Sequence, residues 1–305
     1  MDLLKPTEKM LCPDILARTL TEPSTGNGSK PYAYGNSWQY HSRSDRHSKV
    51  MCWGVTLDLM LACPLLREHV STGKVSVGIN HEMSDFRNKK KKNLDLVLCR
   101  STESGTFGGS KSGRQAARTF AELAPIYGIA LTDHERSLLD TLPPLKIGKV
   151  SSVLLAVEAK AAMTAFHKAR PRLKDELTSS HQTIHGDTDE AIAAGLVMVN
   201  TASEFVSPDM NKFTIDGTNT HVSFNVQPKC AQAVVEGLRE LQRRSKRGDE
   251  GFDGIGVILL ECANNGSPVK VTSPDPVLLP SNDDFDYSRF IHRLAQLYSN
   301  RFQGQ

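Results

Sequence analysis

The stretch that most constrains the fold is the nearly all-apolar run at residues 150–159 (VSSVLLAVEA). It is too short to cross a membrane, which takes roughly 18 apolar residues or more. Rich in Val, Leu and Ala, it is typical of a strand that is buried on both faces in the centre of a sheet. Two later runs, 191–201 (AIAAGLVMVNT) and 254–262 (GIGVILLEC), have the same character. Buried strands of this kind need helices on both faces of their sheet.

The rest of the chain supplies those helices and two further strands. The apolar segment 47–62 predicts a buried helix, and 287–302 predicts a terminal amphipathic one. The order of elements is helix, three strands, helix, strand, helix, strand, helix, which predicts an α/β or α+β fold with a mixed central sheet flanked by helices. The other predicted strands are 74–79 and 93–100, and the other predicted helices are 170–185 and 228–244.

The chain of 305 residues is long enough for one large domain or two small ones. Residues 1–46, rich in Pro, Ser, Gly and Asn, suggest a partly flexible N-terminal extension with one short helix at 13–20. Residues 47–305 are interpreted as a single domain with an insertion at about 101–148. Two short helices are expected in that insertion, at 114–124 and 133–142.

Cysteine usage and hydropathy limit the class of protein. The six cysteines form no C-x-x-C pair and most lie in apolar surroundings, which argues against a zinc ribbon or a disulfide framework. The N-terminus does not resemble a signal peptide, and no apolar run is long enough for a membrane span. We therefore expect a cytoplasmic protein without a membrane segment. The net charge of +3 is mild and identifies no partner.

Charged residues interrupt two of the predicted strands. Glu158 and Lys160 follow the central apolar run, and side chains two apart in a strand project from the same face. Asp95 lies between two leucines in the preceding strand (NLDLVL). Burying such groups is costly unless they are paired or functional. Phosphodiester hydrolysis is one chemistry that uses them, because Mg²⁺ prefers carboxylate oxygens and a nearby ammonium can orient the attacking water.

In this arrangement the chain resembles the PD-(D/E)xK nuclease superfamily, the restriction-endonuclease-like fold, over about half its length, residues 47–201. The resemblance implies that Asp95, Glu158 and the backbone carbonyl of Ala159 bind Mg²⁺, for which Mn²⁺ can substitute, and that Lys160 assists the water. It also implies a core of helix, three antiparallel strands, helix and strand. No proline precedes Asp95, and Asp95 and Glu158 are far apart for this motif. The insertion would explain that spacing; Asp140 is closer to Glu158 but ends a predicted helix.

Further site residues are predicted with an alternative beside each. Asp58, in the first apolar helix, is either a third metal ligand or an acid on the polar side of that helix; Glu68 and Glu82 are its rivals. The basic helix after the motif either contacts DNA or is a solvated charged face. Its candidate DNA-binding residues are Lys168, Arg170, Arg172, Lys174 and Gln182.

Other polar clusters are weaker candidates. His181 and His185 have zinc-ligand spacing but no accompanying ligand, so structural roles are favoured. The clusters 89–92 and 243–247 suit either DNA or solvent. The Gly-rich stretch 104–113 lacks the G-K-[ST] ending of a nucleotide-binding loop.

The function predicted from these features is a Mg²⁺-dependent DNA endonuclease of a restriction or anti-phage defence system. Its substrate would be double-stranded DNA, and cutting both strands suits a homodimer. The alternatives are a nuclease subunit of a defence or repair complex, a nuclease for RNA, and a catalytically silent DNA-binding subunit with the same fold.

Overall fold

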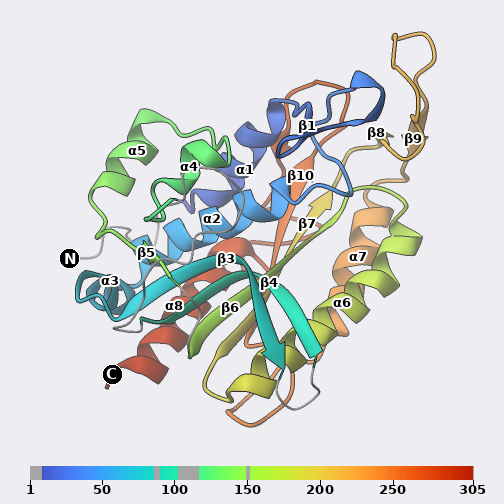
Figure 1. Cartoon of the computed structure of the whole chain (residues 1–305). Helices are drawn as coiled ribbons and strands as arrows, with labels where there is room; N and C mark the ends of the chain where they lie inside the picture. Colours follow the sequence, from blue (N-terminus) through green and yellow to red (C-terminus); the bar gives the residue numbers. More distant parts are fainter. Residues whose placement is uncertain (1–8, 86–89, 102–116, 149–151, 305) are drawn as a thin grey trace.

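The computed structural model describes residues 9–85, 90–101, 117–148 and 152–304. Their centre is one mixed sheet, with strand order β11-β10-β7-β6-β4-β3-β5 (Figure 1). The strands are β3 (Val75–Asp85), β4 (Lys90–Arg100), β5 (Lys146–Ile147), β6 (Val153–Ala162), β7 (Ile192–Asn200), β10 (Gly254–Glu261) and β11 (Lys270–Val271). The described chain is thus a mixed α/β structure.

Two kinds of pairing meet at β6. Strands β3, β4 and β6 form an antiparallel meander, whereas β6, β7 and β10 are parallel. The parallel strands are joined by helices α6 (Phe166–Asp187) and α7 (Lys229–Arg239). Because β6, β7 and β10 run the same way, their C-terminal ends lie at one edge of the sheet, which is where open α/β sheets bind ligands.

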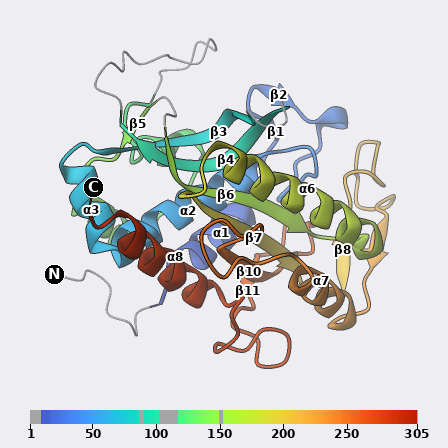
Figure 2. The same cartoon turned by 90° about the horizontal axis from the view of Figure 1, so that it is seen from below.

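Helices cover both faces of the sheet. On one face lie α1 (Cys12–Thr21), α2 (Arg46–Ala62), α3 (Pro64–Ser71) and α8 (Tyr287–Phe302), and on the other lie α6 and α7 (Figures 1 and 2). The smaller elements are β1 (Gly26–Asn27), β2 (Lys30–Pro31), the 3₁₀ helix η1 (Ala33–Gly35), α4 (Leu123–Ile126), α5 (Asp133–Asp140), β8 (Glu204–Val206) and β9 (Val222–Phe224).

Strand β6 is central, as its apolar run predicts. Leu155 and Val157 pack into the core beneath α2, and Ala156 packs into the core beneath α6. The strand continues to Ala162, so Lys160 lies inside it rather than just beyond its end. By alternation, Glu158 and Lys160 project from the same face as Ala156, toward α6.

Three of the predicted helices differ from the observed ones in their bounds. Helix α6 begins at Phe166 rather than at 170, so Pro171 lies in its second turn. The same helix ends at Asp187 rather than at 185, so Gly186 lies inside it. Helix α7 ends at Arg239 rather than at 244, since the chain beyond it turns to bury Arg244. The predicted helix at 114–124 is reduced, among described residues, to α4.

Helix α1, in the predicted N-terminal extension, packs into the core. Ile15, Leu16 and Leu20 of α1 are buried in the cluster beneath α2. The Arg18 guanidinium also donates to the Glu135 carboxylate, at 2.7 Å for Oε1. Glu135 closes a capping box with Thr132 at the start of α5. These contacts fasten the described part of the insertion, 117–148, onto α1.

No single described helix has the length and apolar composition of a membrane span. Helices α2 and α3 meet that test only as a pair, which is bent by 100° at its break.

Candidate functional site

A cavity of about 720 Å³ opens at the C-terminal end of β6. Its floor includes Asp95, Ala159 and Lys160. The first turns of α6 form one side, and the N-terminal end of α2 with the loops around residues 40–45 and 205–210 forms the other. The main chemical residues predicted from the sequence therefore meet at the edge of the sheet where ligand sites are expected.

Asp95 and Glu158 come together across neighbouring strands. The antiparallel register pairs Leu96 with Val157, which places Asp95 and Glu158 next in line. Asp95 Oδ2 accepts the N–H of Ala159 at 2.9 Å. Both carboxylates also act on Cys52 of α2: burial raises the pKa of that thiol, and the charges of Asp95 and Glu158 raise it further. The long insertion between β4 and β6 does not separate the two acids.

Lys160 is held as a cation. Its Nζ lies 2.8 Å from Glu158 Oε1 and 3.3 Å from Oε2 of Glu176, on α6. Burial by itself would lower the pKa of Lys160, but the carboxylates of Glu158, Asp95 and Glu176 outweigh it and raise that pKa. Glu158 is 2% exposed, while the Lys160 side chain is 23% exposed and reaches the cavity. The ammonium therefore separates a buried carboxylate from the open space.

The oxygens at this point suit a hard divalent cation. The N–H and C=O of one strand residue point the same way. Since the Ala159 N–H is directed at Asp95, the Ala159 carbonyl also points toward β4. The pairing of β4 with β6 has already ended there, at Leu96 and Val157. Two carboxylates and a carbonyl are ligands that Mg²⁺ accepts, with water completing its shell. Among the described residues no group of three or more His, Cys, Asp or Glu side chains is arranged around a metal position.

Asp58 does not belong to this site, which corrects its prediction as a metal ligand. Its Oδ1 accepts the Leu11 N–H at 2.9 Å, and its Oδ2 accepts the Cys12 N–H at 3.0 Å and the Tyr287 hydroxyl at 2.9 Å. It lies ten residues beyond Ser48, the last α2 residue on the cavity, which is about 15 Å along a helix. Asp58 instead anchors the start of α1.

The rival acids are not at the cavity either. Glu68 is exposed on α3, and Asp140 is exposed at the end of α5. Neither lines the cavity. The side chain of Glu82 lies outside the described residues. Asp45 and Asp209 do line the cavity but carry no sequence signal, because each comes from a polar loop that is near the motif only in space.

The basic helix divides into two groups. Lys168 and Arg172 line the cavity, and Arg172 Nε lies 2.6 Å from Glu176 Oε1. Arg170 is directed at α7 near Gly237, and Lys174 pairs with Glu240 at 3.1 Å. Gln182 is exposed ten residues beyond Arg172, about 15 Å farther along α6. Only Lys168 and Arg172 of the five predicted DNA contacts are thus placed beside the motif.

Sequence reasoning missed the aromatic side of the cavity. The rings of Tyr40 and His47 lie 5.0 Å apart, and Tyr40 also contacts Phe205 at 6.3 Å. Burial, and then the charge of Lys160, lower the pKa of His47 to about 4, so the imidazole is neutral near pH 7. Burial raises the pKa of Tyr40 to about 12. The polar and aromatic stretch before α2 was the available signal for these residues.

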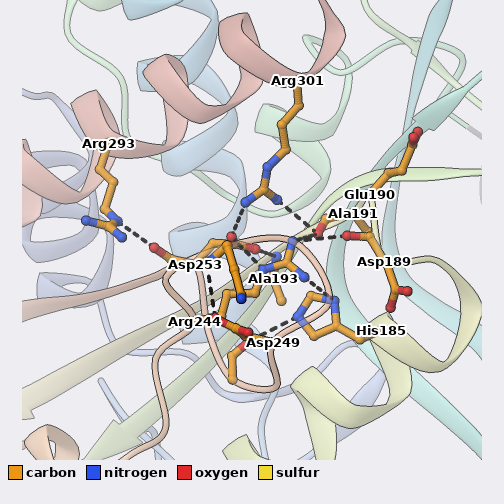
Figure 3. Close-up of polar contacts among 12 residues, drawn as sticks. His185, Asp189, Glu190, Ala191, Ala193, Arg244, Asp249, Asp253, Arg293 and Arg301 are labelled. Carbon is orange, nitrogen blue, oxygen red and sulfur yellow. Dashed lines mark hydrogen bonds and ion pairs between the residues drawn. The ribbon is translucent and has the colours of Figure 1, made fainter.

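His185 belongs to a closed polar cluster at the opposite edge of the sheet (Figure 3). Arg244 Nη1 lies 3.1 Å from His185 Nδ1, so the imidazole accepts there and donates from Nε2 to the Gly251 carbonyl at 3.0 Å. Burial, followed by the charge of Arg244, lowers the pKa of His185. Arg244 Nε donates to Asp253 Oδ1 at 2.8 Å, and Arg301 binds the same oxygen. These contacts support the structural interpretation of His185, and the buried His181 ring packs edge-on against Phe252.

The remaining basic cluster, 243–247, is also engaged within the chain. Besides the buried Arg244, Arg243 pairs with Asp284 at 3.3 Å and Arg247 pairs with Glu190 at 2.5 Å. The lysine cluster 89–92 and the Gly-rich stretch 104–113 lie outside the residues whose side chains the structure describes.

Comparisons of the chain with protein-family models, with curated proteins and with solved structures give no match.

Proposed function

We propose that this chain is a metal-dependent nuclease whose site is of the PD-(D/E)xK type. The observation that carries the proposal is that Asp95 and Lys160 line one cavity and that Glu158 lies beside both, although Asp95 comes from a separate strand. The order α2, β3, β4, β6, α6, β7 supports it, because it follows the helix, antiparallel meander, helix and parallel strand of a restriction-endonuclease-like core.

In this proposal each residue has a separate task. Asp95, Glu158 and the Ala159 carbonyl would hold Mg²⁺ or Mn²⁺, which when bound supplies positive charge to the phosphate and lowers the pKa of a bound water. Lys160 keeps its proton beside Glu158, so it acts by orienting water and by offsetting negative charge on the phosphate. Lys168 and Arg172 contact neighbouring phosphates of the substrate.

DNA is the proposed substrate, and restriction or anti-phage defence is the proposed setting. A homodimer is proposed for the case in which both strands are cut, since two equivalent sites are then needed.

Cleavage of supercoiled plasmid in the presence of Mg²⁺ tests the proposal. We expect the wild type to nick or linearise the plasmid, and Glu158→Gln and Lys160→Met to be slower by roughly 100-fold or more, as when a transition-state contact is removed. Glu135→Gln is the matched control, because it also neutralises a buried carboxylate held by a cation but lies outside the cavity. Cutting by Glu158→Gln at the wild-type rate would contradict the site assignment.

A further inference from the structure

One side of the cavity is a wall made from two segments that are distant in sequence, residues 34–43 and 206–215. In Figure 1 the chain around β1 and β8 lies at the same end of the molecule. The buried Asn36 joins the two segments: its Nδ2 donates to the Phe213 carbonyl at 2.8 Å, and its Oδ1 accepts the Ile215 N–H at 3.1 Å. The two segments of the wall are therefore joined directly by hydrogen bonds and do not form two independent loops.

The wall is also fastened at its base and beside the cavity. Asn264 binds both the N–H and the carbonyl of Tyr40, at 2.9 and 3.0 Å, and donates to the Val206 carbonyl at 2.8 Å. Beside the cavity, Asp209 accepts the Ser42 hydroxyl at 3.1 Å and lies 3.7 Å from Arg43 Nη2. The two segments of the wall are thus held together by several hydrogen bonds. The wall lies next to Asp95, Ala159 and Lys160.

The size of the cavity limits what can reach Asp95 and Lys160 in its lining. A volume of about 720 Å³ is that of a pocket which encloses a small ligand, within the usual range of roughly 300–1,000 Å³. Glu158 is buried and paired with Lys160, which lines the cavity, and the cavity is bounded by the wall on one side and α6 on the other. An intact duplex is far larger than such a pocket, so its phosphates would stay at the rim. A single strand that leaves the duplex can enter.

We propose that the site acts on a DNA strand that is unpaired at the scissile phosphate, either single-stranded DNA or the splayed arm of a duplex. This inference rests on the proposed nuclease function. Met210 lines the cavity mouth and is 60% exposed, so it offers an apolar contact to an unstacked base. Arg43 on the wall and Lys168 on α6 place positive charge on opposite sides of the mouth for the phosphates of that strand.

Three labelled oligonucleotides of the same sequence test this inference: one single-stranded, one fully paired, and one paired with a splayed arm. With Mg²⁺, we expect the single strand and the splayed arm to be cut at least tenfold faster than the paired strand. Equal rates, or faster cutting of the paired strand, would overturn the inference while leaving the nuclease function intact. If none is cut, the nuclease proposal fails, and binding measured by fluorescence anisotropy in EDTA decides: equal affinity for the three would overturn the inference as well.

Two variants with a matched control locate the selectivity. Asp209→Ala releases the rim from Ser42 and Arg43, and we expect the preference for the unpaired strand to fall at least threefold. Met210→Ser should weaken binding of the single strand several-fold and leave binding of the paired duplex unchanged. Phe224→Ser is the control, because Phe224 is 77% exposed on nearby β9 but does not line the cavity. An unchanged preference in both variants, or an equal loss in the control, would contradict the role of the wall.

Discussion

Two groups of buried charges lie at opposite edges of the same parallel strands. At the N-terminal edge of β7 and β10, Arg244 and Asp253 are both nearly fully buried, and they bind each other, nearby backbone groups and the side chains of His185 and Arg301. At the C-terminal edge of β6, Glu158 is equally buried, but its neighbours Asp95 and Lys160 line an open cavity. Both groups are thus buried, but a ligand can reach only the group beside the cavity.

The two groups of charges have different partners. In the closed cluster the Arg244 guanidinium binds Asp253, His185 and the Ala191 carbonyl, so the charge joins α6, β7 and the start of β10 (Figure 3). Such a cluster serves the fold. At the cavity, two carboxylates and a cation stand where a ligand can reach them, which suits chemistry. The comparison predicts that one group controls stability and the other controls activity.

The largest expected effect is on stability, from Arg244→Met. The substitution leaves Arg301 as the remaining ion-pair partner of the buried Asp253 among the described residues, and losing one partner of a buried pair costs about 3–5 kcal/mol. Denaturant unfolding followed by circular dichroism measures the loss. An unfolding free energy within 1 kcal/mol of the wild type would mean that the closed cluster is not structural.

Asp58 is a third enclosed carboxylate, and it should make the unfolding free energy depend on pH. Burial raises its folded-state pKa to about 6, above its ordinary value of 3.8, so the folded protein favours the protonated form. Its contribution to stability is therefore complete below about pH 4 and is lost as the pH rises through about 6. Relative to Asp58→Asn, the unfolding free energy of the wild type should rise on the order of 2–3 kcal/mol between pH 7.5 and pH 4. A flat difference would contradict the burial argument.

Metal binding should change the unfolding free energy by a smaller amount, and only variants of the cavity group should lose that change. A cation bound to the folded state at ten times its dissociation constant raises the unfolding free energy by about 1.4 kcal/mol. We expect Mn²⁺ or Mg²⁺ to stabilise the wild type and Arg244→Met in this way, but not Asp95→Asn or Glu158→Gln. Thermal melts with and without metal measure it. Stabilisation of Glu158→Gln to the same extent would place the cation elsewhere.

The smallest expected effect distinguishes two lysines of α6. Lys168 lines the cavity and Lys174 pairs with Glu240 outside it, while both are exposed. Lys168→Ala should weaken DNA binding a few-fold and reduce the slope of log affinity against log salt by about 1, because one phosphate contact is lost. Lys174→Ala should leave both unchanged. Equal effects of the two substitutions would mean that α6 attracts DNA through its overall charge and not through a contact at Lys168.

Elements with strong local patterns were predictable from the sequence. Strand β6 and helices α2 and α8 carry long apolar or amphipathic runs, and their predicted bounds differ from the observed ones by three residues at most. The meeting of Asp95 with Glu158 also followed from local signals, because both interrupt apolar strands that are consecutive in the meander.

What the sequence could not reveal depends on contacts between distant segments. An Asp between leucines in an apolar helix looks the same whether it binds a metal or, like Asp58, accepts backbone N–H groups from a helix 47 residues away. The cavity wall is equally hidden, since Tyr40 and Asp209 come from polar loops without periodicity. Only the tertiary structure brings them to the motif.

The most direct test of the central claim is the rate of plasmid cleavage per folded molecule for Glu158→Gln beside Arg244→Met, with Mg²⁺. We expect Glu158→Gln to stay folded and lose cleavage, and Arg244→Met to lose stability but cut at the wild-type rate in its folded fraction. Wild-type cleavage by folded Glu158→Gln would contradict it.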